Sequence, residues 1–172
     1  MTAIWGVDAQ VLSDRPESEY GLRVALLKRR PLGSPGGRTM EGVEVGLVYE
    51  DRMVVRPGQA ASLLIPGLPE VLATASLVAF VQLAAAKAVA RHLKSGQVTV
   101  GTKITMAQLA STPVGMEVRA VVRLDGVNDR RLTFMFEAFD AVEKICEGIH
   151  ERYIIDIEWL KRRIEQKLQK VS

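Results

Sequence analysis

Histidine and cysteine, which often serve as bases, nucleophiles or zinc ligands, are few in this sequence. It contains two histidines, His92 and His150, and one cysteine, Cys146. They form no cluster with the spacing of zinc ligands. The sequence also lacks a phosphate-binding glycine loop and a dinucleotide fingerprint. We therefore expect no metal site and no bound cofactor.

Three uncharged polar residues lie within or beside the apolar stretches of the sequence. Thr74 opens a stretch rich in alanine and leucine, and Gln82 is the one polar residue between Leu77 and Ala86. Gln108 follows the strand-like stretch 98–106. A glutamine amide donates and accepts hydrogen bonds, but it takes no proton from water or from a nucleophile at neutral pH. These residues can therefore position a ligand, but they cannot serve as bases.

Turn residues and hydrophobic periodicity predict the elements that position these side chains. Residues 31–39 hold two prolines and three glycines, which is typical of a linker. We expect an N-terminal extension with this linker in residues 1–41, with a possible hairpin in 1–30, and one domain in 42–172.

The longest predicted helix begins near Thr74, whose hydroxyl could cap a free backbone N–H, and ends at Gly96. Only Gln82 is polar between Leu77 and Ala86, so the helix should be buried almost all round. Alternating or β-rich stretches predict strands, and an apolar stripe predicts a C-terminal helix that needs a partner surface. The strands fall at 42–55, 98–106, 116–124, 132–139 and 144–156, and the last helix at 157–171.

This order of elements predicts an α+β fold. An antiparallel sheet wrapped around one long buried helix is the hot-dog fold, although ferredoxin-like orders also mix strands and helices.

Composition indicates one globular domain of ordinary size. The chain has 172 residues, of which 48% are hydrophobic, and a net charge of +3 that favours no particular anionic partner. The longest apolar run, Ala73–Ala86, is too short to span a membrane, and no signal peptide is evident. With a single cysteine, we expect a cytoplasmic protein that contacts neither membrane nor nucleic acid.

Three segments carry a resemblance to a known family. They are PEVLAT at 69–74, VGTKITMAQLASTPVGM at 100–116 and DGVNDRRLTFMFEAFDAVEKICEGIHER at 125–152. From about Val45 onward the chain resembles the hot-dog thioesterases of the fluoroacetyl-CoA thioesterase type. The resemblance implies a homodimer whose sheets join edge to edge, with an acyl-CoA bound at the interface and hydrolysed to acid and CoA.

The resemblance also assigns roles to individual positions. Thr74 stands at the family's hydroxyl position, Gln82 at its acid and Gln108 at its histidine. Gly101 and Arg152 match a glycine and an arginine of the family. Positioned acid–base help is typically worth about 10²–10⁴-fold in rate, so the two glutamines should cripple the family's mechanism. The short LLIPGLPE segment before the helix also implies that the family's aromatic gate is absent.

Each candidate also has a purely structural interpretation. Gln82 could hydrogen-bond across a dimer interface or hold a water or thioester carbonyl, and Gln108 could be a solvated turn residue. On the last strand, His150 and Arg152 share one face. They could form a structural polar pair at the sheet edge. Alternatively, His150 could act as a replacement base, and Arg152 could bind an acyl carboxylate or a CoA phosphate.

Three functions follow from these alternatives. The first is an acyl-CoA thioesterase, and the second is an acyl-CoA-binding or accessory protein without hydrolysis, which the two glutamines favour. The third, lyase or hydratase chemistry on an acyl-CoA, rests on analogy of fold alone.

Overall fold

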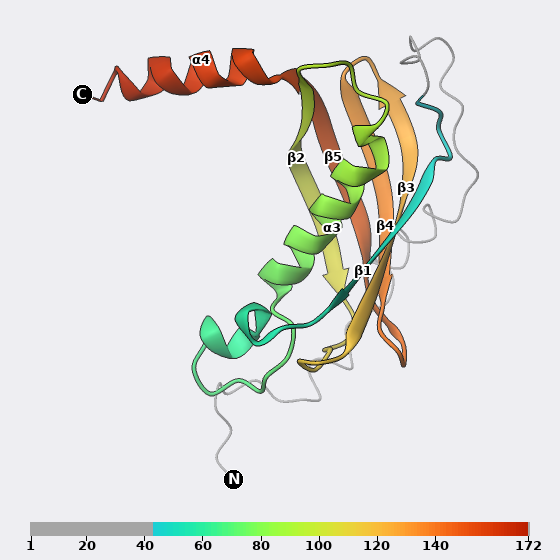
Figure 1. Ribbon diagram of the computed structural model, residues 1–172. Helices are drawn as coiled ribbons and strands as arrows, with labels where there is room; N and C mark the ends of the chain where they lie inside the picture. Colours follow the sequence, from blue (N-terminus) through green and yellow to red (C-terminus); the bar gives the residue numbers. More distant parts are fainter. Residues whose placement is uncertain (1–42, 172) are drawn as a thin grey trace, which may run out of the picture. The chain divides into compact units, whose positions relative to one another are not determined.

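The computed structural model describes residues 43–171 (Figure 1). The extension, linker and hairpin expected in residues 1–41 lie outside the described residues, so the domain boundary stays a prediction. The described part contains five strands and two α-helices, and the connection after the first strand holds two short 3₁₀ turns. The elements are β1 Val48–Val54, η1 Pro57–Gln59, η2 Ala61–Leu63, α3 Thr74–Ala90, β2 Gln97–Gln108, β3 Glu117–Asn128, β4 Arg131–Phe139, β5 Lys144–Asp156 and α4 Ile157–Leu168.

The five strands form one antiparallel sheet in the order β1-β3-β4-β5-β2, and α3 lies against one of its faces (Figure 1). This is the hot-dog arrangement, and it confirms the predicted α+β fold. β1 and β2 are the two edge strands. β5 lies between β4 and β2, so the expectation that His150 and Arg152 lie at a sheet edge is wrong.

The core lies between α3 and the inward faces of the central strands. On β3 the alternation predicted from the sequence is confirmed, because every second residue is fully buried. The inward residues of β3 and β4 are Val118, Ala120, Val122, Leu124, Leu132, Phe134, Phe136 and Ala138. Leu77, Val81, Ala84 and Val89 of α3 pack against them. Burying this apolar surface is the main force that holds the helix on the sheet.

α3 begins at Thr74, as predicted, but its cap and its C-terminal end differ from the prediction. Its N-cap residue is Ala73, which makes no side-chain cap, and Thr74 is the first helical residue. The helix ends at Ala90, and Gly96, with φ +80°, lies in the turn before β2. The helix is also not buried all round, since Leu83 is 51% exposed. In place of the expected cap, the Thr74 hydroxyl hydrogen-bonds to the side chain of Gln108 on β2.

The connection between β1 and α3 spans residues 55–73, so it is longer than the segment LLIPGLPE on which the prediction of a short lid rested. It carries η1 and η2 and exposes four large apolar side chains near the start of α3. These are Leu63, Leu64, Ile65 and Leu68.

The C-terminal helix α4 follows β5 directly and has no buried residue. Asp156 caps its start by accepting a hydrogen bond from the backbone N–H of Trp159, at 3.0 Å. Its apolar stripe includes Ile164, which is half exposed. The surface that this stripe would meet stays a prediction. No helix in residues 43–171 is long and apolar enough to cross a membrane.

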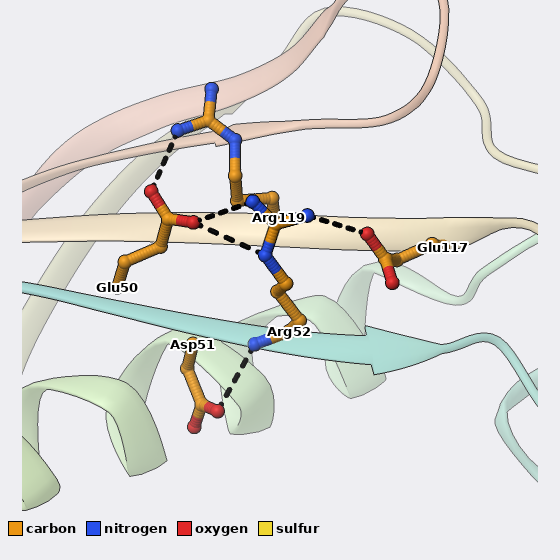
Figure 2. A network of polar contacts seen from close by, with 5 residues as sticks. All are labelled: Glu50, Asp51, Arg52, Glu117 and Arg119. Atoms are coloured by element: carbon orange, nitrogen blue, oxygen red, sulfur yellow. Dashed lines mark hydrogen bonds and ion pairs between the residues drawn. The ribbon is translucent and has the colours of Figure 1, made fainter.

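An ion-pair network joins the edge strand β1 to β3 on the outer face of the sheet (Figure 2). Glu50 accepts hydrogen bonds from Arg119 and Arg52, and Arg52 also reaches Glu117 at 2.8 Å. The bond from Arg119, and then that from Arg52, lowers the pKa of Glu50. These pairs are solvated, so the network ties the two strands in register and contributes little stability per pair.

Candidate functional site

The Thr74 hydroxyl and the Gln108 side chain meet at the start of α3. The Thr74 Oγ1 donates a hydrogen bond to Gln108 Oε1 at 2.6 Å. Gln108 is the last residue of β2, and its Nε2 donates to the backbone carbonyl of Ala110 at 3.4 Å. Both residues are exposed. Two residues that lie 34 positions apart in the sequence are thus brought together, as their positions in the resemblance imply.

The first turn of α3 adds backbone donors beside this pair. The N–H of Leu77 is the first to bond within the helix, to the carbonyl of Ala73 at 3.0 Å. In the described part of the chain, the N–H groups of residues 74–76 have no backbone partner. They lie at the positive end of the helix dipole and can stabilise a carbonyl oxygen or a developing oxyanion.

A second polar cluster lies further along α3, where the helix crosses β2 and β5. A Cβ added to Gly101 would lie 2.6 Å from Gln82 Oε1 and 3.0 Å from His150 Cε1. Gly101 therefore allows the Gln82 side chain to rest directly on β2. The strand pairing shifts by one residue between Gly101 and Lys103, next to the backbone carbonyl that His150 contacts. The close approach explains why a glycine is needed at this position.

Arg152 holds this second cluster together. Its guanidinium donates to Thr99 Oγ1 and to the backbone carbonyls of Thr99 and Gln82, at 2.8, 2.7 and 3.1 Å. It also donates to His150 Nε2 at 3.0 Å. Thr99 was not singled out from the sequence, and only its place on β2, two residues before Gly101 and thus on the same face of the strand, could have indicated it.

The contacts of His150 define which of its ring nitrogens carries the proton. Because Nε2 accepts from Arg152, Nδ1 must carry the hydrogen, which it donates to the carbonyl of Lys103 at 2.9 Å. Burial, and to a lesser extent the charge of Arg152, lowers the pKa of His150 despite the opposing effect of that bond. The lone pair that a base would use is already occupied. We therefore interpret His150 as a neutral structural partner of Arg152 and not as a replacement base.

This interpretation predicts how stability depends on pH. The folded pKa of His150 lies below the unfolded value, so the unfolded chain takes up a proton first as the pH falls below about 6.5. Stability should therefore decrease with falling pH through this window, and His150→Gln should flatten the decrease. Urea denaturation at several pH values measures the slope, with His92→Gln as the matched control. Equal slopes for wild type and His150→Gln would contradict the assignment.

The three positions that resemble the family's reactive residues do not form one constellation within a single chain. Thr74 and Gln82 are eight residues apart on one helix, which is about 12 Å along its axis. Gln108 contacts Thr74, whereas Gln82 lies against Gly101 and His150.

Other reactive groups in the described residues contribute little to the chemistry of the candidate site. Residues 43–171 contain no group of three or more His, Cys, Asp or Glu side chains that could hold a metal ion. Cys146 is buried, and desolvation raises the pKa of its thiol to about 12. A thiol with this pKa stays protonated and is a poor nucleophile. Cys146 is therefore a small residue of the hydrophobic core.

A groove of about 910 Å³ lies between β1 and the exposed side of α3. Its apolar walls include Met53 and Val54 of β1 and Leu83 of α3, and its cations include Arg56 and Lys87. Ser76, in the first turn of α3, also lines it. The groove therefore reaches the same helix end that presents free N–H groups. No motif in the sequence indicated it, because it forms only when the edge strand packs beside the helix.

Comparisons with known proteins agree on one family and one fold. The family model of fluoroacetyl-CoA-specific thioesterases matches residues 55–158. A fluoroacetyl-CoA thioesterase from Streptantibioticus cattleyicolor is 33% identical over 133 residues, which cover 74% of this chain and 96% of the relative. A crystal structure of a fluoroacetyl-CoA thioesterase aligns with a TM-score of 0.70 at 33% identity, over 73% of this chain and 98% of that one.

A more distant structure supports the fold alone. A hot-dog-like protein from Thermanaerovibrio acidaminovorans has a TM-score of 0.69 at 23% identity, over 74% of this chain and 94% of that one.

Proposed function

Because the chain belongs to the family of fluoroacetyl-CoA-specific thioesterases, we propose that it binds an acyl-CoA thioester at the start of α3 and hydrolyses it only slowly. The observation that carries this proposal is the 2.6 Å hydrogen bond between Thr74 and Gln108. It holds a hydroxyl at the helix end, where a thioester carbonyl can accept hydrogen bonds from backbone N–H groups. The hydroxyl is paired with an amide, which cannot take its proton.

The groove beside α3 supports binding of the CoA part of the ligand. Its volume of about 910 Å³ is within the usual range of small-molecule pockets. The apolar walls fit an alkyl or pantetheine chain, and Arg56 offers positive charge for phosphates, whereas Lys87 is already paired with Asp51 at 2.7 Å. Arg56 makes no ion pair within residues 43–171. A ligand whose carbonyl lies at Thr74 can extend past Ser76 into this groove.

Slow hydrolysis follows from the residues that replace the family's titrating groups. Gln82 and Gln108 stand at the acid and histidine positions that the resemblance assigns. His150 has its lone pair engaged by Arg152, and Cys146 is protonated and buried. Efficient hydrolysis remains the second candidate function, favoured by the oriented Thr74 hydroxyl. It would require a base from elsewhere.

The assembly and location are part of the same proposal. β2 is an edge strand whose outer side has no partner strand within the described chain, so a second copy pairing along it would cover the edge. We propose a cytoplasmic homodimer with residues 1–41 as an N-terminal extension. Neither a cofactor nor a nucleic-acid or membrane partner is needed.

Equilibrium titration with acetyl-CoA tests this proposal. Thr74→Val should weaken binding roughly 3- to 10-fold, because in the complex the Thr74 hydroxyl would turn its proton from Gln108 to the thioester carbonyl, and a neutral hydrogen bond contributes about 0.5–1.5 kcal/mol. Thr105→Val is the matched control: this threonine is exposed, as Thr74 is, but it lies on β2 and not at the start of α3. Absence of acetyl-CoA binding by the wild type, or an equal effect of both variants, would contradict the proposed site.

A further inference from the structure

Arg152 is a buried cation whose hydrogen-bond partners are all neutral. Its exposed fraction is 5%. The four groups that accept from it are a hydroxyl, two backbone carbonyls and the unprotonated nitrogen of His150. No carboxylate among residues 43–171 forms an ion pair with it. Burial lowers the pKa of Arg152, but a guanidinium keeps its charge in proteins. The second cluster therefore carries one uncompensated positive charge.

A buried charge without an opposite charge is strongly unfavourable. A carboxylate at position 82 would supply the opposite charge. The backbone carbonyl of Gln82 accepts a hydrogen bond from Arg152, and the Gln82 side chain lies beside His150, which Arg152 also contacts. The resemblance places an acid at this position, and the chain has an amide instead. Glutamine in place of glutamate keeps the size of the side chain but leaves Arg152 without an opposite charge. An anionic ligand could supply that charge.

Arg152 and the Gln82 amide both offer hydrogen-bond donors in the second cluster. A guanidinium has five N–H groups, and the four hydrogen bonds of Arg152 leave one N–H without an acceptor in the described part of the chain. The Gln82 amide makes no side-chain hydrogen bond within residues 43–171, and this residue is partly exposed. An anion that approaches Gln82 would receive amide hydrogen bonds and the nearby charge of Arg152.

We propose that Gln82 and Arg152 form a carboxylate subsite, so that the preferred ligand is a CoA monothioester of a dicarboxylic acid. The inference rests on the proposed function and adds the class of acyl group. A glutamate at position 82 would repel the carboxylate of such a ligand, whereas the amide donates to it. Gly101 is required because any side chain there would displace Gln82.

The test is a set of binding titrations with CoA monothioesters of dicarboxylic acids of increasing length. Each is paired with the acyl-CoA of equal length that ends in a methyl group. The wild type should bind the carboxylate form of at least one length about 10- to 100-fold more tightly, as expected for hydrogen bonds to a charged group. Gln82→Glu should reverse this preference, and Gln82→Leu should reduce it. Thermal melts confirm that both variants are folded.

The outcomes separate the subsite from the proposed function. If neutral acyl-CoA thioesters bind as tightly as acidic ones and Gln82→Glu changes neither, the subsite is refuted while acyl-CoA binding stands. If no thioester binds, both proposals fail. Free dicarboxylates without CoA form a third arm. If they bind as tightly as their monothioesters, the cluster recognises a free acid and the proposed acyl class is wrong.

Discussion

A protein carrying Gln82→Glu together with Gln108→His is expected to release CoA from acetyl-CoA about 10²–10⁴ times faster than the wild type. This is the range of rate gain that a positioned acid or base provides. The wild-type Thr74 hydroxyl already points at residue 108, at 2.6 Å. An imidazole there could accept its proton or that of a water, and a carboxylate at 82 would also balance Arg152. Thiol release under saturating substrate measures the gain.

The matched control is Gln82→Leu with Gln108→Leu, which removes both amides without adding a titrating group. This control should be no faster than the wild type. Acetyl-CoA is the right substrate for the comparison, because its acyl group carries no carboxylate that Gln82→Glu could repel. A folded Gln82→Glu, Gln108→His protein with wild-type rates would show that the missing acid and base are not what limits hydrolysis.

Gly148→Ala is expected to cause the largest loss of stability, about 3 kcal/mol, at the upper end of the range for overpacked cores. A Cβ at this position would lie 2.1 Å from the backbone oxygen of Thr105 and 2.6 Å from the ring of Phe136. Thr105 belongs to β2, which is paired with β5 along almost its whole length. Its carbonyl cannot retreat without breaking that pairing. Urea denaturation measures the change in free energy of unfolding.

Gly58→Ala provides the matched control for Gly148→Ala. A Cβ at Gly58 would have no atom within 4 Å, and its φ is not in the left-handed region. Its free energy of unfolding should therefore change by no more than about 0.5 kcal/mol. Equal stability of the two variants would mean that β2 and β5 are not packed as closely as described.

Local patterns explain which parts of the fold could be predicted from the sequence. Alternation on β3 identified the buried face, because burial of one side of a sheet imposes a period of two. The exact extent of β5, 144–156, followed from turn residues and β-rich composition. The start of α3 at Thr74 was predicted, but its cap and its end were predicted less well. Thr74 looks like a helix cap in sequence, but its hydroxyl bonds to Gln108 on another element.

In the site, too, features set by neighbouring residues could be predicted from the sequence, and features set by distant contacts could not. The shared face of His150 and Arg152 follows from strand alternation and is confirmed by their 3.0 Å contact. That β5 is an interior strand could not be predicted, since strand order depends on contacts distant in the sequence. The positions of Thr74, Gln82 and Gln108 were assigned by resemblance alone, and only the structure separates Gln82 from the other two.

The most direct test of the central claim is thiol release by the wild-type protein itself. Protein in excess over acetyl-CoA is followed through a single turnover from about pH 6 to 9, the range in which an imidazole would titrate. We expect acetyl-CoA to bind and its hydrolysis to stay close to the uncatalysed rate, without an inflection in this range. A rate more than about 10²-fold above background, with an inflection that reports a titrating base, would contradict the account.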